Sequence, residues 1–213
     1  PNHIELGLER VGQVWNSLTQ VPPKQVISVA GTNGKGSAVE AAGVLAKAQG
    51  LAYGQYTSPH IYAIQERVRV DGTQASDHEL IKAFEMVESA RGSIFLTYFE
   101  FLTLAAFVIF EGRDLDLWIL EIGLGGRLDA VNIIDPSVSI ITSIGLDHQL
   151  FLGDDIESIA REKAGVMRKA IPTLTAATNV RDVLEAEALT HEAQLVWLDT
   201  ALKNGKLNIS ASG

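Results

Sequence analysis

The stretch VISVAGTNGKGS, residues 26–37, decides the fold of this chain. Its first five residues are mostly apolar, which predicts a short buried β-strand. Glycines at positions 31, 34 and 36 then turn the chain, and an alanine-rich helical segment follows. A strand, a glycine-rich turn and a helix in this order are typical of an α/β unit whose helix amino terminus faces a bound anion.

The turn carries the groups that a polyphosphate needs. Lys35 supplies a full positive charge, and Gly34 and Gly36 allow backbone N–H groups to turn inward. The Ser37 hydroxyl stands at the usual place for a magnesium contact. The common phosphate loop has a glycine where this chain has Val29, and a Ser or Thr directly after the lysine. The pattern therefore favours nucleotide binding, and a plain structural turn stays open.

Composition limits the classes of protein. The chain has 213 residues, of which 46% are hydrophobic and 20% charged, so a sizeable core is expected. Its net charge of −9 argues against general nucleic-acid binding, and the absence of cysteine excludes a disulfide framework. The sequence contains neither a signal peptide nor an apolar run long enough to span a bilayer, so we expect a cytoplasmic protein without a membrane partner.

Strands and helices alternate along the chain. Helices are predicted over residues 3–20, 37–49, 77–91, 93–111, 155–167 and 181–191, and strands over residues 26–30, 51–56, 67–70, 115–122, 137–144, 173–176 and 195–198. This alternation predicts an α/β fold with a mostly parallel sheet and helices on both faces. Residues 1–200 form the expected domain, and residues 201–213 look like a linker or the start of a further part.

Unusual residues follow the predicted strands, where parallel sheets collect ligands. Glu121 ends an otherwise apolar strand and precedes a glycine-rich run, and His148 follows Asp147 after the next strand. With a hydroxyl, Glu121 and His148 would make an oxygen and imidazole site suited to Mg²⁺ near nucleotide phosphates. A salt-bridged strand end at Glu121 and a simple loop at His148 remain alternatives.

Other candidates are ambiguous on the residues alone. Lys163 lies on a predicted helix, where a lysine is usually a solvated charge, and the aromatic residues of 97–100 are typical of a core. Ser58 precedes a proline and could belong to a cis peptide in a tight turn. Arg127 and Asp129 could contact a ligand or pair with each other.

Taken together, the motifs resemble a known family. The segments AGTNGKGS, YTSPH, ERVRVDG, LTYFEFLT, LEIGLGGRLDAVN and SIGLDHQLFLGDDIESIAREKAGV, in this order, resemble the folylpolyglutamate synthase family. The opening IELGLERV resembles its bacterial bifunctional dihydrofolate synthase members in particular, and the resemblance extends over about residues 3–170. A remote similarity to the Mur ligases implies a P-loop-type Mur ligase-like ATPase domain.

The resemblance implies roles for particular residues, with ATP and Mg²⁺ as cofactors. Phosphate binding is implied for Gly34, Lys35, Gly36 and Ser37. The implied metal ligands are Ser58, Glu121 and His148. The implied catalytic residues are Lys35, His148 and Lys163, and Lys163 is also implied to be carbamylated. Contact with a pteroate substrate is implied for Glu5, Leu6, Gly7, Leu8, Thr97, Tyr98, Phe99, Glu100, Leu128, Asp129 and Ala130.

The implied activity is ATP-dependent amide ligation. L-Glutamate would be added to dihydropteroate or to a folate polyglutamate tail through an acyl phosphate, by a monomeric enzyme. The family's carboxy-terminal glutamate-binding domain finds no match here, so we expect the 213-residue chain itself not to ligate. Val131, Gln149 and Asp155 stand where the family usually has threonine. A Mur-type peptide ligase, a nucleotide-dependent switch and a nucleotide-binding module without ligase activity remain alternatives.

Overall fold

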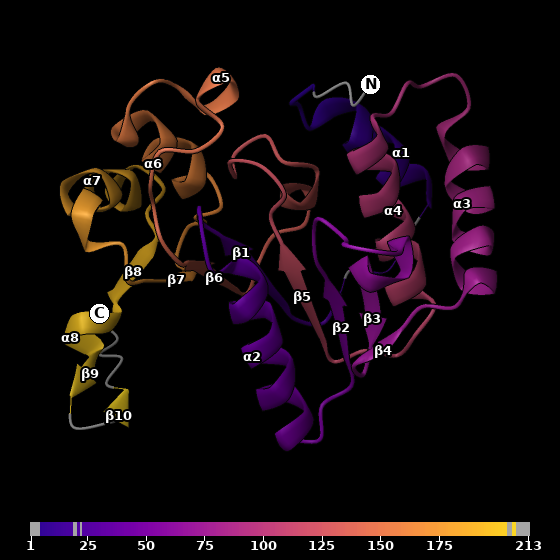
Figure 1. Ribbon diagram of the computed structural model, residues 1–213, viewed down its shortest axis with the longest axis horizontal. Helices are drawn as coiled ribbons and strands as arrows, with labels where there is room; N and C mark the ends of the chain where they lie inside the picture. The colour runs from indigo at the N-terminus through magenta and orange to yellow at the C-terminus, as the bar shows by residue number, and fades with distance from the viewer. Residues whose placement is uncertain (1–4, 19–20, 22, 204–205, 208–213) are drawn as a thin grey trace.

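Eight strands form one twisted sheet in the order β4-β3-β2-β5-β1-β6-β7-β8 (Figure 1). The computed structural model describes residues 5–18, 21, 23–203 and 206–207. The strands are β1 (Val26–Ala30), β2 (Tyr53–Tyr56), β3 (Val68–Val70), β4 (Thr73–Gln74), β5 (Leu117–Glu121), β6 (Val138–Ile141), β7 (Pro172–Thr175) and β8 (Gln194–Trp197). Every pairing from β2 to β8 is parallel, whereas β3 pairs antiparallel with β2 and β4. The predicted mostly parallel sheet is confirmed.

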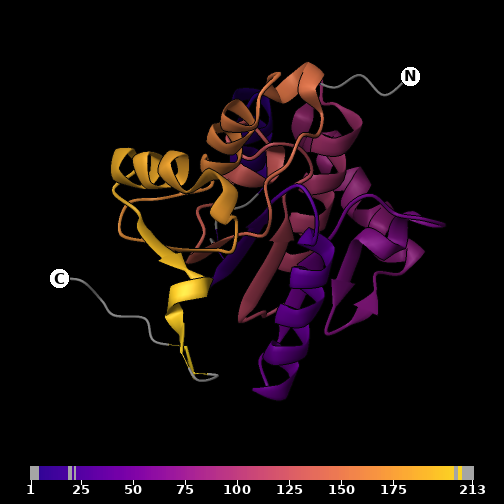
Figure 2. The same cartoon turned by 60° about the vertical axis from the view of Figure 1, so that its left-hand side comes forward.

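Helices connect the strands. They are α1 (Glu9–Leu18), α2 (Lys35–Ala48), α3 (Asp77–Arg91), α4 (Tyr98–Glu111), α5 (Gln149–Leu152), α6 (Ile156–Ala164), α7 (Arg181–Thr190) and α8 (Leu198–Ala201), with 3₁₀ turns at Ile64–Arg67, Ala130–Ile133 and Thr178–Val180. A ribbon of β9 (Leu202–Lys203) and β10 (Lys206–Leu207) follows. Figures 1 and 2 both place this ribbon at one end of the molecule and α3 at the other.

The sheet is buried on both faces, as its central strand β5 shows. Leu117 and Ile119 face one side, where they pack in a cluster with Val39 of α2. Trp118 and Leu120 face the other side, in the larger core that includes α1 and α4. Because successive strand residues point to opposite faces, an all-apolar strand requires helices on both sides. The predicted two-sided packing is therefore confirmed.

An aromatic cluster holds the larger core together. The ring of Phe107 on α4 is fully buried, with its centroid 5.4 Å from that of Trp15 and 5.5 Å from that of Trp118. These rings join α1, α4 and β5. Because α4 also packs against α3, the residues between positions 102 and 110 are all buried, which explains why its sequence is apolar on every side.

The prediction of a helix over residues 93–111 is wrong in its first turn. The helix begins at Tyr98, because Thr97 is its N-cap. The Thr97 side chain accepts the backbone N–H of Glu100, and the Glu100 carboxylate accepts the N–H of Thr97 at 2.7 Å. This reciprocal capping satisfies donors that the first turn leaves open. The same device at Ser76 and Glu79 begins α3 at Asp77, the first residue of the helix predicted over 77–91.

The first helix also begins later than predicted. Residues 5–8 lie outside α1, and the N–H of Gly7 donates to the carbonyl of Leu128 at 3.3 Å. This contact ties the segment to the loop after β5 instead of to the helix. Positions 3, 4, 19 and 20 of the predicted helix lie outside the described residues.

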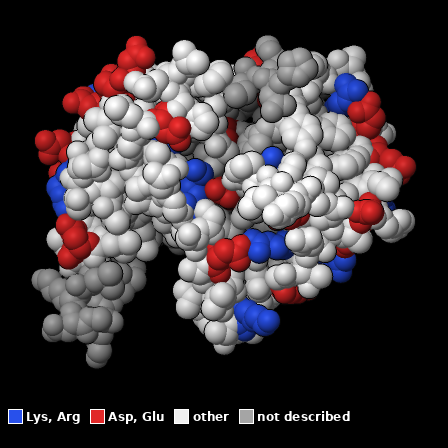
Figure 3. Space-filling model, in the orientation of Figure 1, with Lys and Arg blue, Asp and Glu red and all other residues white. Residues whose placement is uncertain are grey.

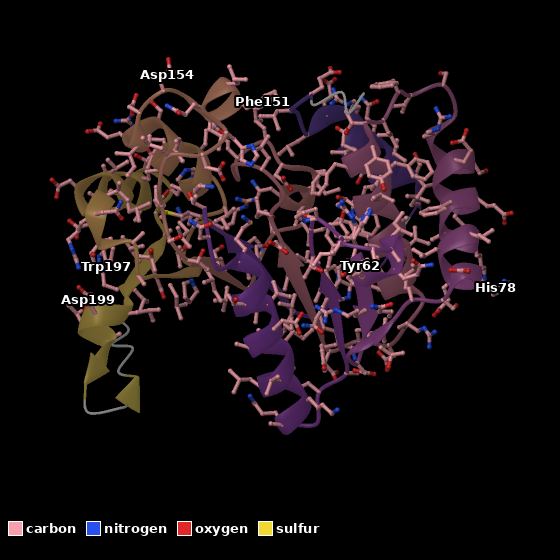
Figure 4. All side chains as sticks on the ribbon, in the orientation of Figure 1. Tyr62, His78, Phe151, Asp154, Trp197 and Asp199 are labelled. Carbon is pink, nitrogen blue, oxygen red and sulfur yellow. The ribbon has the colours of Figure 1, made fainter. Side chains whose placement is uncertain are left out.

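At the far end of the sheet, Arg181 attaches α8 to α7. Its guanidinium stacks 3.9 Å from the ring centroid of Trp197 and pairs with Asp199 at 2.7 Å. Figure 4 shows Trp197 and Asp199 close together at this end. Among the described residues, no helix has both the length and the apolarity needed to cross a membrane.

The aromatic cluster makes a prediction about stability. Phe107→Ala should lower the free energy of unfolding by about 3–5 kcal/mol, because it leaves a cavity among buried rings. Tyr62→Ala, which removes a ring that is 93% exposed, should change it by no more than about 0.5 kcal/mol. Denaturant titration followed by circular dichroism measures both values, and equal losses in the two variants would contradict this account of the core.

Candidate nucleotide and substrate site

The site lies at the edge of the sheet where the parallel strands end. β1 lies between β5 and β6, and β2 lies beyond β5. The loops that follow β1, β2, β5 and β6 therefore gather at one place, the upper edge in Figure 1. Figure 3 shows this face hollowed between its left and right parts, with basic and acidic atoms inside the hollow.

The glycine-rich turn leaves the first turn of α2 open to an anion. Gly34 is the N-cap with φ of 85°, and no side chain caps the helix. The first N–H groups of the helix therefore lack intrahelical partners and point toward the site. A Cβ at Gly31 would lie 1.9 Å from the Thr142 hydroxyl, so only glycine allows this approach. The Lys35 ammonium folds back to the carbonyls of Gly31 and Thr32, at 3.1 and 3.3 Å.

A cavity of about 440 Å³ opens beside this loop. Lys35, Ser58 and His148, three of the residues with implied phosphate, metal or catalytic roles, line it. Most of the implied pteroate residues also line it, namely Glu5, Leu6, Thr97, Phe99, Glu100, Leu128, Asp129 and Ala130. Lys35 of the phosphate loop and the segments implied to contact pteroate are distant in the sequence, yet they line one cavity.

The remaining candidates lie around the cavity and do not line it. Gly34, Gly36 and Ser37 lie at the amino end of α2, and Glu121 and Lys163 lie behind the lining. The implied substrate residues Gly7, Leu8 and Tyr98 are outside the lining as well. Tyr98 is exposed, and its ring centroid lies 5.9 Å from the Arg67 guanidinium.

The structure brings two of the three implied metal ligands into direct contact. The buried carboxylate of Glu121 accepts the backbone N–H of Ser58 at 3.0 Å. Burial raises the pKa of Glu121, while the Ser58 N–H and the charges of Lys35 and Arg67 act in the opposite direction. His148 is exposed at the start of α5, with φ of 48°, and lines the same cavity as Ser58.

These residues fit a cation that is shared with a nucleotide. Hydroxyl, carboxylate and imidazole groups are suitable donors, and Glu121 Oε2 lies 3.9 Å from the position a Cβ would take at Gly36 of the phosphate loop. Within the described part of the chain, no three His, Cys, Asp or Glu side chains come close enough to hold a metal ion. A magnesium ion here therefore needs additional oxygen ligands, which the phosphates of a nucleotide supply.

Lys163 is buried against the phosphate loop. Only 3% of the residue is exposed, and its ammonium donates to the carbonyl of Gly31 at 3.0 Å, the same oxygen that Lys35 contacts. Burial, and then the charge of Lys35, lowers the pKa of Lys163 to about 8. The alternative of a solvated helix lysine is wrong, because α6 turns this residue inward.

Asp129 is also buried, and it organises the loop after β5. Its carboxylate accepts the N–H groups of Leu124 and Val131 at 2.8 and 2.9 Å. Burial raises the pKa of Asp129 to about 7, so the protonated and ionised forms of this carboxyl group are both present near neutrality. The suggested Asp129–Arg127 pair is wrong, since Arg127 pairs with Glu162 at 2.6 Å.

Sequence reasoning missed two arginines of the site. Arg10 on α1 places its Nε 2.9 and 3.0 Å from the Glu100 carboxylate oxygens and its Nη1 2.7 Å from Glu5. Arg67 lines the cavity and donates its Nε to His60 Nδ1 at 2.8 Å. The ERVRVDG motif contains Arg67 and the IELGLERV segment contains Arg10, but neither arginine was assigned a role. The neighbouring Ser58–Pro59 peptide is cis.

The parallel sheet with its glycine-lysine loop is a Mur ligase-like fold, and known proteins share it. The chain is 44% identical to the structure described as E. coli FolC in complex with DHPP and ADP, with a TM-score of 0.87 over 91% of this chain and 47% of that one. It is 46% identical, with a TM-score of 0.87, to a bifunctional folylpolyglutamate synthase/dihydrofolate synthase with Mn, AMPPNP and L-glutamate bound, over 94% of this chain and 50% of that one.

The chain is homologous to bacterial dihydrofolate synthase/folylpolyglutamate synthases. It is 49% identical over 172 residues to that of Escherichia coli strain K12, covering 80% of this chain and 41% of the relative. It is 38% identical over 213 aligned residues to that of Bacillus subtilis strain 168, covering 93% and 48%. The chain spans about half the length of the curated relatives that it matches. No protein-family model matches it.

The buried lysine makes stability depend on pH. Because the pKa of Lys163 is about 8 in the folded chain and near 10.5 when exposed, the unfolded chain binds more protons between these values. The free energy of unfolding should therefore rise from pH 8 to 10.5, by about 2–3 kcal/mol from this group, and that gain is lost as the pH falls from 10.5 to 8. Denaturant titrations across this range should show a flatter profile for Lys163→Met, and an unchanged profile for the exposed control Lys47→Met.

Proposed function

We propose that this chain supplies the nucleotide- and pteroate-binding part of an ATP-dependent amide ligase, a dihydrofolate synthase/folylpolyglutamate synthase. The observation that carries the proposal is the shared cavity, in which Lys35 of the phosphate loop faces residues suited to a flat aromatic acid. Phe99, Leu124 and Leu128 provide apolar surface there, while Asp129 offers a polar group beneath it. The homologues named above support the same assignment.

In this proposal ATP binds with its phosphates at the amino end of α2. The open N–H groups of Gly34 to Ser37 and the ammonium of Lys35 provide the positive charge. Ser58, Glu121 and His148 would hold magnesium, which neutralises charge on the phosphates when it is bound. Phosphoryl transfer requires positioning and charge neutralisation more than covalent help from the protein, and this site provides both.

The reaction has two steps. A carboxylate oxygen of dihydropteroate, or of a folate glutamate tail, attacks the γ-phosphorus of ATP, and ADP leaves. The resulting acyl phosphate is attacked by the amine of L-glutamate, an amide bond forms, the amine loses a proton and inorganic phosphate leaves. Lys35 stabilises the charge that develops during the first step, because its ammonium lies between the loop carbonyls and the cavity.

The proposal concerns the protein at its full natural length. The chain spans about half the length of its curated relatives, and the roles proposed for the described residues do not include a site for L-glutamate. Residue roles in the cavity follow the resemblance and remain predictions. The domain boundary near residue 200 also remains a prediction.

Lys35→Ala should remove ATP-dependent amide formation by the full-length protein, with a fall in kcat of at least about 100-fold, because one preorganised charge at the transferred phosphoryl group is lost. Lys47→Ala lies on the same helix but is exposed at its far end, and should keep normal turnover. The measurement is glutamate incorporation into dihydropteroate with ATP and Mg²⁺. Normal turnover in Lys35→Ala would remove the assignment.

Lys163 should accept carbon dioxide to form a carbamate. With a pKa of about 8, about half of the amine is neutral at pH 8, whereas an ordinary lysine is almost wholly protonated there. The neutral Nζ adds CO₂ and releases one proton, so the neutral amine becomes a carbamate anion beside the phosphate loop. NMR with ¹³C-bicarbonate should show one carbamate signal that Lys163→Arg lacks and Lys47→Arg retains. A signal of equal strength in Lys163→Arg would exclude this site.

A further inference from the structure

Arg67 is a buried cation that forms no ion pair with the described residues. It ends the 3₁₀ turn Ile64–Arg67 and is 8% exposed. Within the described part of the chain, no Asp or Glu oxygen lies within ion-pairing distance of its guanidinium, whereas Arg10, Arg127 and Arg168 each have a carboxylate partner. A guanidinium keeps its charge in proteins, and burying that charge unpaired is costly.

The groups that contact Arg67 do not neutralise it. Its Nε donates to Nδ1 of His60 at 2.8 Å, which requires that imidazole nitrogen to be a deprotonated acceptor. It also interacts with the side chain of Tyr56, and the Tyr98 ring centroid lies 5.9 Å from the guanidinium carbon. These contacts fix the plane of the guanidinium and leave its positive charge available.

Arg67 lines the same cavity as Lys35 of the phosphate loop but comes from a different part of the sheet. β5 and β2 stand between β1 and β3 in the sheet, so the residue that leads into β3 is two strands away from the loop that follows β1. Both Arg67 and Lys35 line the same cavity, together with apolar residues such as Phe99 and Leu124. The cavity therefore combines apolar residues with two separate cations. Of the carboxyl groups in its lining, Glu5 and Glu100 pair with Arg10, and Asp129 accepts backbone N–H groups.

We propose that Arg67 binds the carboxylate of the acceptor substrate, an aromatic carboxylic acid, and selects substrates that carry this charge. The planar fork of a guanidinium matches a carboxylate with two parallel hydrogen bonds, which an ammonium does not reproduce. Lys35 serves the phosphates, and Arg67 places the attacking carboxylate beside them. The inference rests on the proposed function, since it names the group that holds that function's acceptor.

The test uses the full-length protein and three ligands. Calorimetry measures binding of dihydropteroate, of its neutral carboxamide analogue, and of the ATP analogue AMPPNP with Mg²⁺. Arg67→Lys and Arg67→Met should each weaken dihydropteroate binding by about 10- to 100-fold, the loss expected for a charge-assisted hydrogen-bonded pair. Binding of the carboxamide and of AMPPNP should change by less than about threefold.

Arg69→Met is the matched control, because Arg69 lies two residues further along on β3 and pairs with Glu40 outside the cavity lining. It should leave all three affinities unchanged. Thermal unfolding followed by circular dichroism verifies that each variant is folded. If Arg67→Met does not fold, Arg67→Lys still tests the contact, because it keeps the positive charge and removes the guanidinium.

Three results would overturn the inference. Equal losses for dihydropteroate and the carboxamide would show that Arg67 only shapes the cavity. A loss confined to AMPPNP would assign Arg67 to the phosphates. Unchanged dihydropteroate binding in both variants would remove the role of Arg67 and leave the proposed function intact, whereas a wild-type protein that binds no dihydropteroate would remove both.

Discussion

The structure depends on one carbonyl oxygen, that of Gly31 at the end of β1. Lys35 from α2 and Lys163 from α6 both donate to it, at 3.1 and 3.0 Å. Two ammonium groups on one acceptor hold the phosphate loop, the central strand and a distant helix together. They also repel each other, which contributes to the lowered pKa of Lys163. Two lysine side chains are thus gathered at the phosphate loop, although the chain carries a net charge of −9.

Buried charged groups also lie at the cavity next to this loop. Glu121 and Asp129 are buried carboxyl groups whose pKa values burial raises, and each is held by backbone N–H groups instead of a cation. Arg67 is a buried cation with no carboxylate partner among the described residues. Among the described residues, these carboxyl groups are hydrogen-bonded to backbone N–H groups, and Arg67 donates to an imidazole. Groups held in this way are free to meet a cation, a phosphate and a carboxylate from outside.

Much of the fold followed from sequence patterns, and the errors have local causes. The alternation of strands and helices predicted the parallel sheet, yet the apolar residues of 93–97 suggested a helix that begins only at Tyr98. Hydrophobic content extends beyond a helix end, whereas the capping pair Thr97 and Glu100 fixes it. Residues 5–8 carried helical periodicity, but the contact of Gly7 with Leu128, far along the chain, holds them in another conformation.

The sequence by itself determined the class of fold and the position of the phosphate loop, because glycine turns, capping pairs and strand periodicity are local properties of the chain. Only the tertiary structure decided which charges are buried. Lys163 meets a carbonyl 132 positions away, and Arg10 meets Glu100 across 90 positions. Burial and pairing depend on which distant segments pack together, and no local pattern reports that. The distinction between a solvated lysine and a buried one therefore had to come from the packing of α6 against the loop after β1.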